Sequence, residues 1–464
     1  MVQISANVQR AVALVVGCLC MAIAGSVYCY GVYIVSVKKH YNYTQSAVEL
    51  FGSTSNFGIS LGFPAGMMCE RFGGRWASLA GLLISSLGYM LLWSTTLMSH
   101  FYSTKSALQA VYFFVAGFGA IFLYMAAMTT NSINFNPKHR GKIVGILDAS
   151  FSAGPAIMAL LYGKIFAAGH VHDEENQNLG GFYLTTAISF SVIGIMGVSF
   201  LNSHPYEGER QIDEISLRVN ESTIAGTFEV VGDTGPPIRN VTGLKLLLRF
   251  DYHFIAWSYI FCAGLQLMFQ NNIQTYLKTF DLEEYTTLFG TVNPVCGVLS
   301  KFVVGFVSDM IVTKVPRVAL LLIFNIVQTI TLTLCIFFSD QFVMLVAALL
   351  VIGLANGAVW CLTPTMISEF YGLKYFGRNW GATIFGNAIG GFVVQQVYGW
   401  TYDNSIRIKG ATDCKAGVHC FTWSFAMAAV LSFCACIFNI GLLQYQNDIK
   451  NRQSRTQNEP RTEL

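Results

Sequence analysis

Charged residues are scarce in this chain of 464 residues, because Asp, Glu, Lys and Arg together make up only 11%. A soluble protein of this length carries about 25% charged residues, so the composition excludes an ordinary soluble protein. The large share of hydrophobic residues, 53%, excludes a disordered chain. The formal net charge of +3 does not indicate a nucleic-acid partner. The composition instead predicts an integral protein that crosses the lipid bilayer many times, in the plasma membrane or an endomembrane.

The sequence also lacks motifs that are typical of enzymes and pumps. It contains no H-E-x-x-H zinc motif and no phosphate-binding loop. We therefore expect no enzyme, no metal site, no cofactor and no ATP-driven pump. Twelve cysteines are present, but most lie inside apolar stretches, where a thiol acts as a small packing residue.

Apolar runs of about 20 residues, the length that crosses the hydrocarbon core, recur along the chain. Six of these runs precede a polar stretch and six follow it. The predicted spans are 10–35, 46–69, 75–97, 108–132, 143–168, 181–202, 252–277, 286–310, 317–338, 342–369, 381–402 and 421–444. This pattern divides the chain into a six-helix bundle (1–202), a cytosolic central loop (203–249), a second six-helix bundle (250–445) and a cytosolic tail (446–464).

The distribution of basic residues predicts the orientation. With both termini in the cytosol, 19 lysines and arginines lie on the cytosolic side and 8 on the opposite side. Basic residues favour the cytosolic loops of membrane proteins. We therefore expect cytosolic termini.

The two halves share a repeated pattern of glycine, acid and arginine. Gly66 precedes Glu70 by four residues after span 2, and Gly305 precedes Asp309 by four residues after span 8, at an offset of 239. Basic residues precede spans 5 and 11 at an offset of 238. A glycine permits two helices to approach closely, and an acid neutralises the positive N-terminus of a neighbouring helix. Two matching offsets predict a duplicated unit with a conformational latch, which comprises Gly66, Glu70, Arg71, Arg75, Arg140, Gly305, Asp309 and Arg378.

The stretch from Gly66 to Arg75 has the pattern G-x-x-x-(D/E)-R-x-G-x-R, which together with the six-plus-six layout resembles the major facilitator superfamily. This resemblance covers nearly the whole chain. It implies an all-α membrane protein with twelve transmembrane helices in two six-helix repeats.

A narrower resemblance lies in residues 30–33, 134–147 and 414–421, which are similar to the nodulin-like branch and, more distantly, to the monocarboxylate porters. It implies a carrier for a small organic anion.

Lys301 lies deep inside span 8, four residues before Gly305. A charge inside a membrane costs a few kcal/mol, so such a residue is a functional candidate. This position resembles the anion-binding position of the two branches named above. Those branches usually have an arginine there, whereas this chain has a lysine. The alternative is a lysine that neutralises an acid or extends to the interface.

Two further ionisable positions are candidates. Lys38 lies at the outer end of span 1, a region where the monocarboxylate porters carry a lysine. It either attracts anions into the cavity or anchors the helix at the membrane interface. Asp148 lies about two turns into span 5 and is a proton-coupling candidate. The alternative is a structural role in which Asp148 pairs with Lys142 or with a neighbouring helix. The monocarboxylate porters place their acid in span 8, where this chain has Gly297.

Polar residues of spans 1, 4, 7 and 10, which line the cavity in the superfamily, complete the predicted substrate site. Amides and phenols bind polar solutes, but they also join helices to each other. The candidates are Tyr30, Tyr33, Tyr124, Asn131, Gln270 and Asn356.

The ends of the chain carry two weaker signals. Cys414 and Cys420 lie in a polar loop on the non-cytosolic side, where a disulfide is permitted, and the family resemblance covers both. The final residues, 461–464, match a ligand of PDZ domains, although so short a match also arises by chance.

The leading hypothesis is a secondary transporter that works by alternating access on a small-molecule substrate, a small organic anion such as a monocarboxylate. The alternatives are a nutrient sensor or scaffold with the same fold, and a carrier of a neutral polar solute or amino acid.

Overall fold

The computed structural model describes residues 6–170, 173–206, 240–282, 285–405 and 417–458. All regular secondary structure in these ranges is helical, as the sequence predicts. The elements of the first half of the chain are α1 (Ala6–Gly25), η1 (Ser26–Val32), α2 (Ile34–Tyr41), α3 (Gln45–Ser60), α4 (Gly62–Phe72), α5 (Gly74–Leu97), α6 (Ser99–Tyr102), α7 (Ser106–Asn134), η2 (Pro137–His139), α8 (Arg140–Leu161), η3 (Tyr162–Phe166), η4 (Glu174–Asn176) and α9 (Leu179–Phe200). The later elements are α11 (Leu244–Leu247), α12 (Phe250–Thr279), α13 (Thr286–Ile311), α14 (Arg317–Phe338), α15 (Phe342–Tyr371), α16 (Phe376–Ser405), η6 (Gly417–Cys420) and α17 (Thr422–Asn458).

Within the described ranges, ten helical segments are long and apolar enough to cross a membrane. The two other predicted spans correspond to α3 with α4 and to α16. The first of these is interrupted at Leu61, because Pro64 lacks an N–H and its ring is incompatible with a helix continuing from Ser60. Large apolar side chains remain exposed along the outer faces of the helices, for example Leu160, Ile195, Phe392 and Trp400. An outward apolar surface of this extent indicates contact with lipid, and the protein is an integral, multi-pass membrane protein.

The described chain forms two compact units. Of the residues described above, the first unit contains those between positions 1 and 206 together with Tyr375–Ala388, and the second contains those between 207 and 374 and between 389 and 464. The first part of α16 therefore packs with helices that come from the other half of the sequence.

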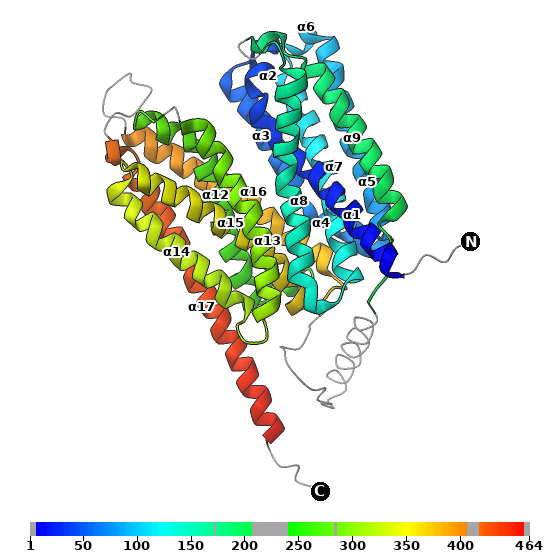
Figure 1. Cartoon of the computed structure of the whole chain (residues 1–464), viewed down its shortest axis with the longest axis vertical. Coiled ribbons are helices and arrows are strands. Elements are labelled where there is room, and N and C mark those ends of the chain that lie inside the picture. The colour runs from blue at the N-terminus through cyan, green and yellow to red at the C-terminus, as the bar shows by residue number, and fades with distance from the viewer. Residues whose placement is uncertain (1–5, 171–172, 207–239, 283–284, 406–416, 459–464) are drawn as a thin grey trace, which may run out of the picture. The chain divides into compact units, whose positions relative to one another are not determined.

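In the first unit, α5 packs against both α7 and α9, while α3 packs on α7 and α1 on α7 and α8 (Figure 1). Small residues allow these close approaches. The side chain of Ser85 on α5, for example, donates a hydrogen bond to the Ala116 carbonyl of α7 at 3.2 Å.

In the second unit, α13 packs on α15, and α14 packs on α15 and α17 (Figure 1). An aromatic cluster closes the core at one end of α12. The Tyr276 ring lies 4.5 Å from that of Phe421 and 5.4 Å from that of Phe425.

Candidate functional site

Lys301 is buried in the second unit. Its side chain projects from α13, only 3% of the residue is exposed, and Nζ lies 5.2 Å from the ring centroid of Trp360 on α15. The Trp360 ring in turn packs edge-on against Tyr259 of α12, with centroids 5.5 Å apart. A desolvated cation–π contact contributes about 2 kcal/mol. An aromatic wall from two neighbouring helices therefore stabilises the buried ammonium group.

The close approach of α13 and α15 explains how Lys301 reaches Trp360. A Cβ atom added at Gly357 would lie 2.5 Å from the Gly297 carbonyl oxygen and 2.6 Å from Cβ of Ser300. The Ser300 hydroxyl also donates a hydrogen bond to the Leu354 carbonyl at 2.6 Å. The two helices therefore meet backbone to backbone, one turn before Lys301.

Amide side chains form a chain of hydrogen bonds in the same three helices. Nε2 of Gln266 donates to Oδ1 of Asn293 at 2.6 Å and to Oε1 of Gln270 at 3.2 Å. Nδ2 of Asn293 donates to the Leu349 carbonyl at 2.8 Å. Gln270 is exposed, whereas Asn293 is buried. Oδ1 of the half-buried Asn356 has no hydrogen-bond partner within the part of the chain that the structure describes.

Two of the predicted residues, Tyr124 and Asp148, meet in the core of the first unit. The Tyr124 hydroxyl on α7 donates to Oδ1 of Asp148 on α8 at 3.3 Å, and both residues are fully buried. The same hydroxyl oxygen accepts the indole N–H of Trp380, from the segment Tyr375–Ala388, at 3.2 Å. The three side chains form a continuous hydrogen-bonded chain.

Three of the other polar candidates of the first unit make contacts that join helices or fill the core. Nδ2 of Asn131 donates to the Ala13 carbonyl at 3.2 Å and thus joins α7 to α1. The Tyr30 hydroxyl donates to the Val48 carbonyl at 2.8 Å. The Tyr33 ring is buried among aromatic neighbours that include Phe182, 5.1 Å away. Lys38 lies half-buried in the last turn of α2. A substrate role for these four residues remains a prediction.

The acid of the first repeated loop binds the start of α16. Oε1 of Glu70 accepts the backbone N–H of Arg378 at 2.8 Å, and Oε2 accepts Nε of the same arginine at 3.0 Å. Gly66 and Gly377 pack backbone to backbone at this point, because a Cβ on Gly66 would overlap the Gly377 carbonyl group. Glu70 thus neutralises the positive end of a helix.

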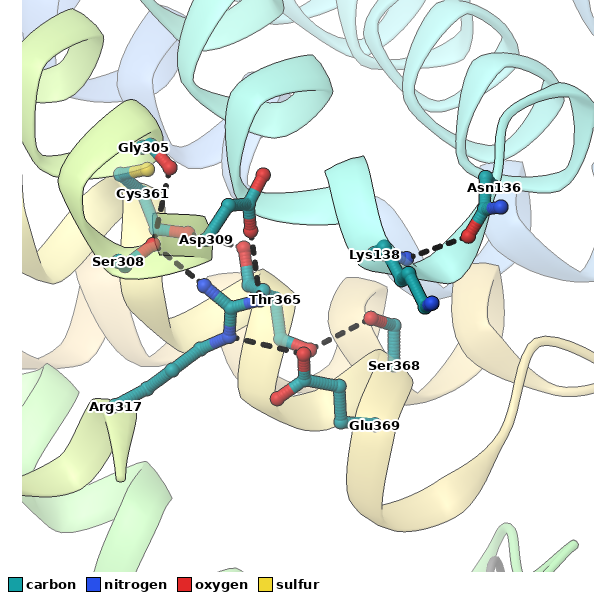
Figure 2. A network of polar contacts seen from close by, with 10 residues as sticks. All are labelled: Asn136, Lys138, Gly305, Ser308, Asp309, Arg317, Cys361, Thr365, Ser368 and Glu369. Atoms are coloured by element: carbon teal, nitrogen blue, oxygen red, sulfur yellow. Dashed lines mark hydrogen bonds and ion pairs between the residues drawn. The ribbon is translucent and has the colours of Figure 1, made fainter. Parts of the chain in front are cut away.

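The acid of the second loop has a different partner in the second unit. Figure 2 shows the Arg317 guanidinium between the carboxylates of Asp309 and Glu369. Its Nη2 donates to Oδ1 of Asp309 at 2.7 Å and its Nε to Oε1 of Glu369 at 2.9 Å, while Nη1 donates to the Ser308 hydroxyl. The Ser308 hydroxyl donates to the Gly305 carbonyl at 3.1 Å. Arg317 is 4% exposed, so this network is buried.

The remaining arginines of the loops have separate contacts. Nε of Arg75 donates to the Val198 carbonyl at 2.7 Å and caps the end of α9. Arg71 lies against the Phe72 ring, 5.4 Å from its centroid. Arg140, 6% exposed, begins α8 just after η2, which Asn136 caps by accepting the Lys138 N–H at 2.9 Å (Figure 2).

An ion pair also fixes the start of α12. Nε and Nη2 of Arg249 donate to the two Asp251 carboxylate oxygens at 2.8 and 2.6 Å, and Nη2 also donates to the Tyr445 hydroxyl of α17 at 3.2 Å. These hydrogen bonds to Asp251 raise the pKa of the Arg249 guanidinium above its usual range. The two helices are thereby joined where the central loop enters the second unit.

Cys420 is part of a disulfide. Its predicted partner Cys414 lies outside the described residues, so the pairing of the two remains a prediction. The predicted PDZ ligand at residues 461–464 also lies outside them.

Sequence reasoning missed Trp380, Asn293 and Glu369. Asn293 could have been found, because it is an amide within a predicted span. Trp380 carried no such signal, since an aromatic side chain at the end of an apolar run usually indicates packing or an interface.

Comparison with known proteins agrees with this architecture. Residues 14–395 match the family described as the Major Facilitator Superfamily. The chain is 23% identical over 453 residues to the probable transporter MCH1 of Yarrowia lipolytica, covering 89% of this chain and 88% of the relative. It is 22% identical over 406 residues to the probable transporter MCH1 of Wickerhamomyces anomalus, covering 85% of this chain and 79% of the relative.

Solved structures share the fold at low sequence identity. The proton:xylose symporter XylE aligns with a TM-score of 0.68 at 14% identity, covering 94% of this chain and 96% of that structure. A bacterial homologue of the iron transporter ferroportin aligns with a TM-score of 0.65 at 12% identity, covering 93% and 98%. The predicted fold class is confirmed, and the chain belongs to the Major Facilitator Superfamily.

Proposed function

We propose that this protein is a secondary transporter that carries a small organic anion, such as a monocarboxylate, and that Lys301 binds the anion. The observation that carries this proposal is the buried ammonium group of Lys301, which lies over the Trp360 ring within the helical core. The curated relatives named above are called probable transporters, which agrees with a transport function. The resemblance to the nodulin-like and monocarboxylate-porter branches suggests the class of substrate.

The energetics favour an anionic ligand. A lysine at the centre of a membrane costs about 2.5–3.5 kcal/mol, and a cation–π contact offsets about 2 kcal/mol of this. A carboxylate that approaches Lys301 would add a charge-assisted hydrogen bond in a medium of low dielectric constant. Since lysine presents a point charge rather than a planar fork, we expect tolerance toward the shape of the carboxylate.

We propose that Asp148 couples transport to protons. Asp148 is fully buried within α8, and ionisable residues inside membrane-spanning helices often form proton relays. Tyr124, at 3.3 Å, is in position to stabilise the carboxylate.

We propose that the ion pairs at the repeated loops act as latches between states. Glu70 binds Arg378 and Asp309 binds Arg317. Both pairs lie at the predicted cytosolic ends of helices. Alternating access would break and reform such pairs as two six-helix halves rock about a central site.

A carrier of a neutral polar solute is the second candidate. The chain of amides formed by Gln266, Asn293 and Gln270 favours it, because amides both donate and accept hydrogen bonds. A sensor or scaffold would use the same groups without turnover.

Flux measurements in proteoliposomes separate these functions. We expect saturable uptake of radiolabelled lactate, pyruvate or oxalate, and a loss of at least tenfold in Lys301→Gln and Lys301→Ala. Lys314→Gln, at an exposed turn, is the matched control and should keep wild-type flux. Unchanged flux in both Lys301 variants would remove the anion site, uptake of amino acids alone would favour the neutral carrier, and saturable binding without flux would favour the sensor.

A further inference from the structure

The hydrogen-bonded chain of Trp380, Tyr124 and Asp148 has a fixed direction. An indole N–H only donates, so the Tyr124 oxygen must be the acceptor in its contact with Trp380 at 3.2 Å. The hydroxyl proton of Tyr124 is then available for Asp148, 3.3 Å away. The order of donation therefore runs from Trp380 through Tyr124 to the carboxyl group.

Trp380, the first donor in this hydrogen-bonded chain, belongs to residues 375–388. Residues 375–388 pack on α4 through two pairs of glycines, Gly66 with Gly377 and Gly62 with Gly381. Gly377 also faces α7, since a Cβ added there would lie 2.9 Å from Cγ2 of Thr129. We call these contacts, together with the Glu70–Arg378 pair, the α4–α16 seam. Trp380 lies along this seam and is fully buried.

We propose that Trp380 is a positioning residue for the Tyr124–Asp148 pair and links that pair to the α4–α16 seam. While the seam is closed, the indole N–H holds the Tyr124 hydroxyl toward Asp148. A hydrogen bond to an ionised acceptor is stronger than one to a neutral acceptor, and hydrogen bonds in a chain strengthen one another. Loss of charge on Asp148 therefore weakens the hold of Trp380 on Tyr124, and the seam opens more readily.

Cys69 provides a native probe of the seam. It lies three residues after Gly66, so it is on the same side of α4 as that glycine, which contacts residues 377 and 378. The residue is 8% exposed, and its thiol should react with N-ethylmaleimide chiefly when the seam is open. Labelling of Cys69, measured by mass spectrometry of its peptide in nanodisc-embedded full-length protein, reports opening without any substrate. Labelling of the half-buried Cys296 on α13 is the internal reference.

The variants separate the hydrogen bond from packing. Replacement of Trp380 by β-(3-benzothienyl)alanine keeps the shape of indole and removes its N–H, while Tyr124→Phe removes only the hydroxyl. Each should raise Cys69 labelling about fivefold, the equilibrium factor of one hydrogen bond. Asp148→Asn should raise it less. The benzothienyl analogue combined with Tyr124→Phe should again give about fivefold, because both changes break the same hydrogen-bonded chain. Trp400→Phe, on an exposed face of α16, is the matched control and should have no effect.

An unchanged rate with the benzothienyl analogue would overturn the proposal, and so would a combined effect equal to the product of the single effects. The functional meaning of the link rests on the proposed coupling role of Asp148. Lactate flux tests the coupling role of Asp148 separately. For the benzothienyl variant at position 380 we expect a lower maximal rate and an unchanged KM, because Trp380 positions Tyr124 and not the substrate. If the wild-type protein transports no probe while Cys69 labelling follows the pattern above, the proposed function fails and the link stands.

Discussion

Removal of the Glu70 carboxylate should free the N–H of Arg378 at the start of α16. The first amides of a helix have no intrahelical acceptor, and the Arg378 N–H is bound instead by Glu70 at 2.8 Å, while Nε of the same residue is bound at 3.0 Å. Hydrogen bonds with an ionised partner contribute about 1.5–3 kcal/mol each. The Arg378 side chain is 29% exposed, so we assign about 1.5 kcal/mol to each bond.

Glu70→Ala loses both bonds, about 3 kcal/mol, which corresponds to an equilibrium factor on the order of 100. Glu70→Gln keeps an amide oxygen for the backbone N–H, so we expect a loss nearer tenfold. Hydrogen exchange of the Arg378 amide, resolved to single residues by mass spectrometry, should accelerate by these two factors.

Two comparisons make this test specific. Arg71→Gln changes a charge of the same loop that lies against Phe72, and it should leave Arg378 exchange unchanged. Exchange of amides in the middle of α5 should stay slow in all variants, which shows that the bundle remains folded. Equal exchange of Arg378 in wild type and Glu70→Ala would refute the assignment of its N–H to Glu70.

Three further predictions concern the second unit. Arg317→Gln leaves the carboxylates of Asp309 and Glu369 without their cation, and we expect a loss of folding stability of about 3–5 kcal/mol. The thermal unfolding temperature in detergent should fall, and an unchanged temperature would contradict a buried network. Gly357→Ala places a Cβ 2.5 Å from the Gly297 carbonyl oxygen, so we expect destabilisation of about 1–3 kcal/mol. An unchanged unfolding temperature in the same assay would mean that α13 and α15 are not in backbone contact. Trp360→Leu removes the aromatic face beside Lys301 and should raise the KM for lactate about fivefold or more, with Trp360→Phe intermediate; equal KM values would exclude a cation–π role.

Sequence reasoning placed the simple spans well. The predicted ranges 75–97, 181–202 and 317–338 correspond to α5 (Gly74–Leu97), α9 (Leu179–Phe200) and α14 (Arg317–Phe338). These helices match because hydrocarbon thickness sets their length and apolar composition shows it directly. The break of span 2 at Leu61 depends on where Pro64 falls relative to the helix.

The sequence indicated candidate site residues but not which of them lie in contact. The cost of burying charge singled out Lys301 and Asp148 from the sequence alone, because few ionisable groups occur within apolar runs. Their neighbours Trp360, Tyr124 and Trp380 come from distant segments, and no local pattern indicates which aromatic group faces which charge.

The sequence by itself determined that this is a helical membrane protein, roughly where its helices begin and end, and which few polar groups lie within them. These properties follow from local composition, since each helix satisfies its own backbone hydrogen bonds. Only the tertiary structure decided that Glu70 binds Arg378 while Asp309 binds Arg317, although the two loops repeat the same pattern. The partner of a side chain depends on which helix faces lie within hydrogen-bonding distance, and glycine contacts such as Gly66 with Gly377 set that spacing.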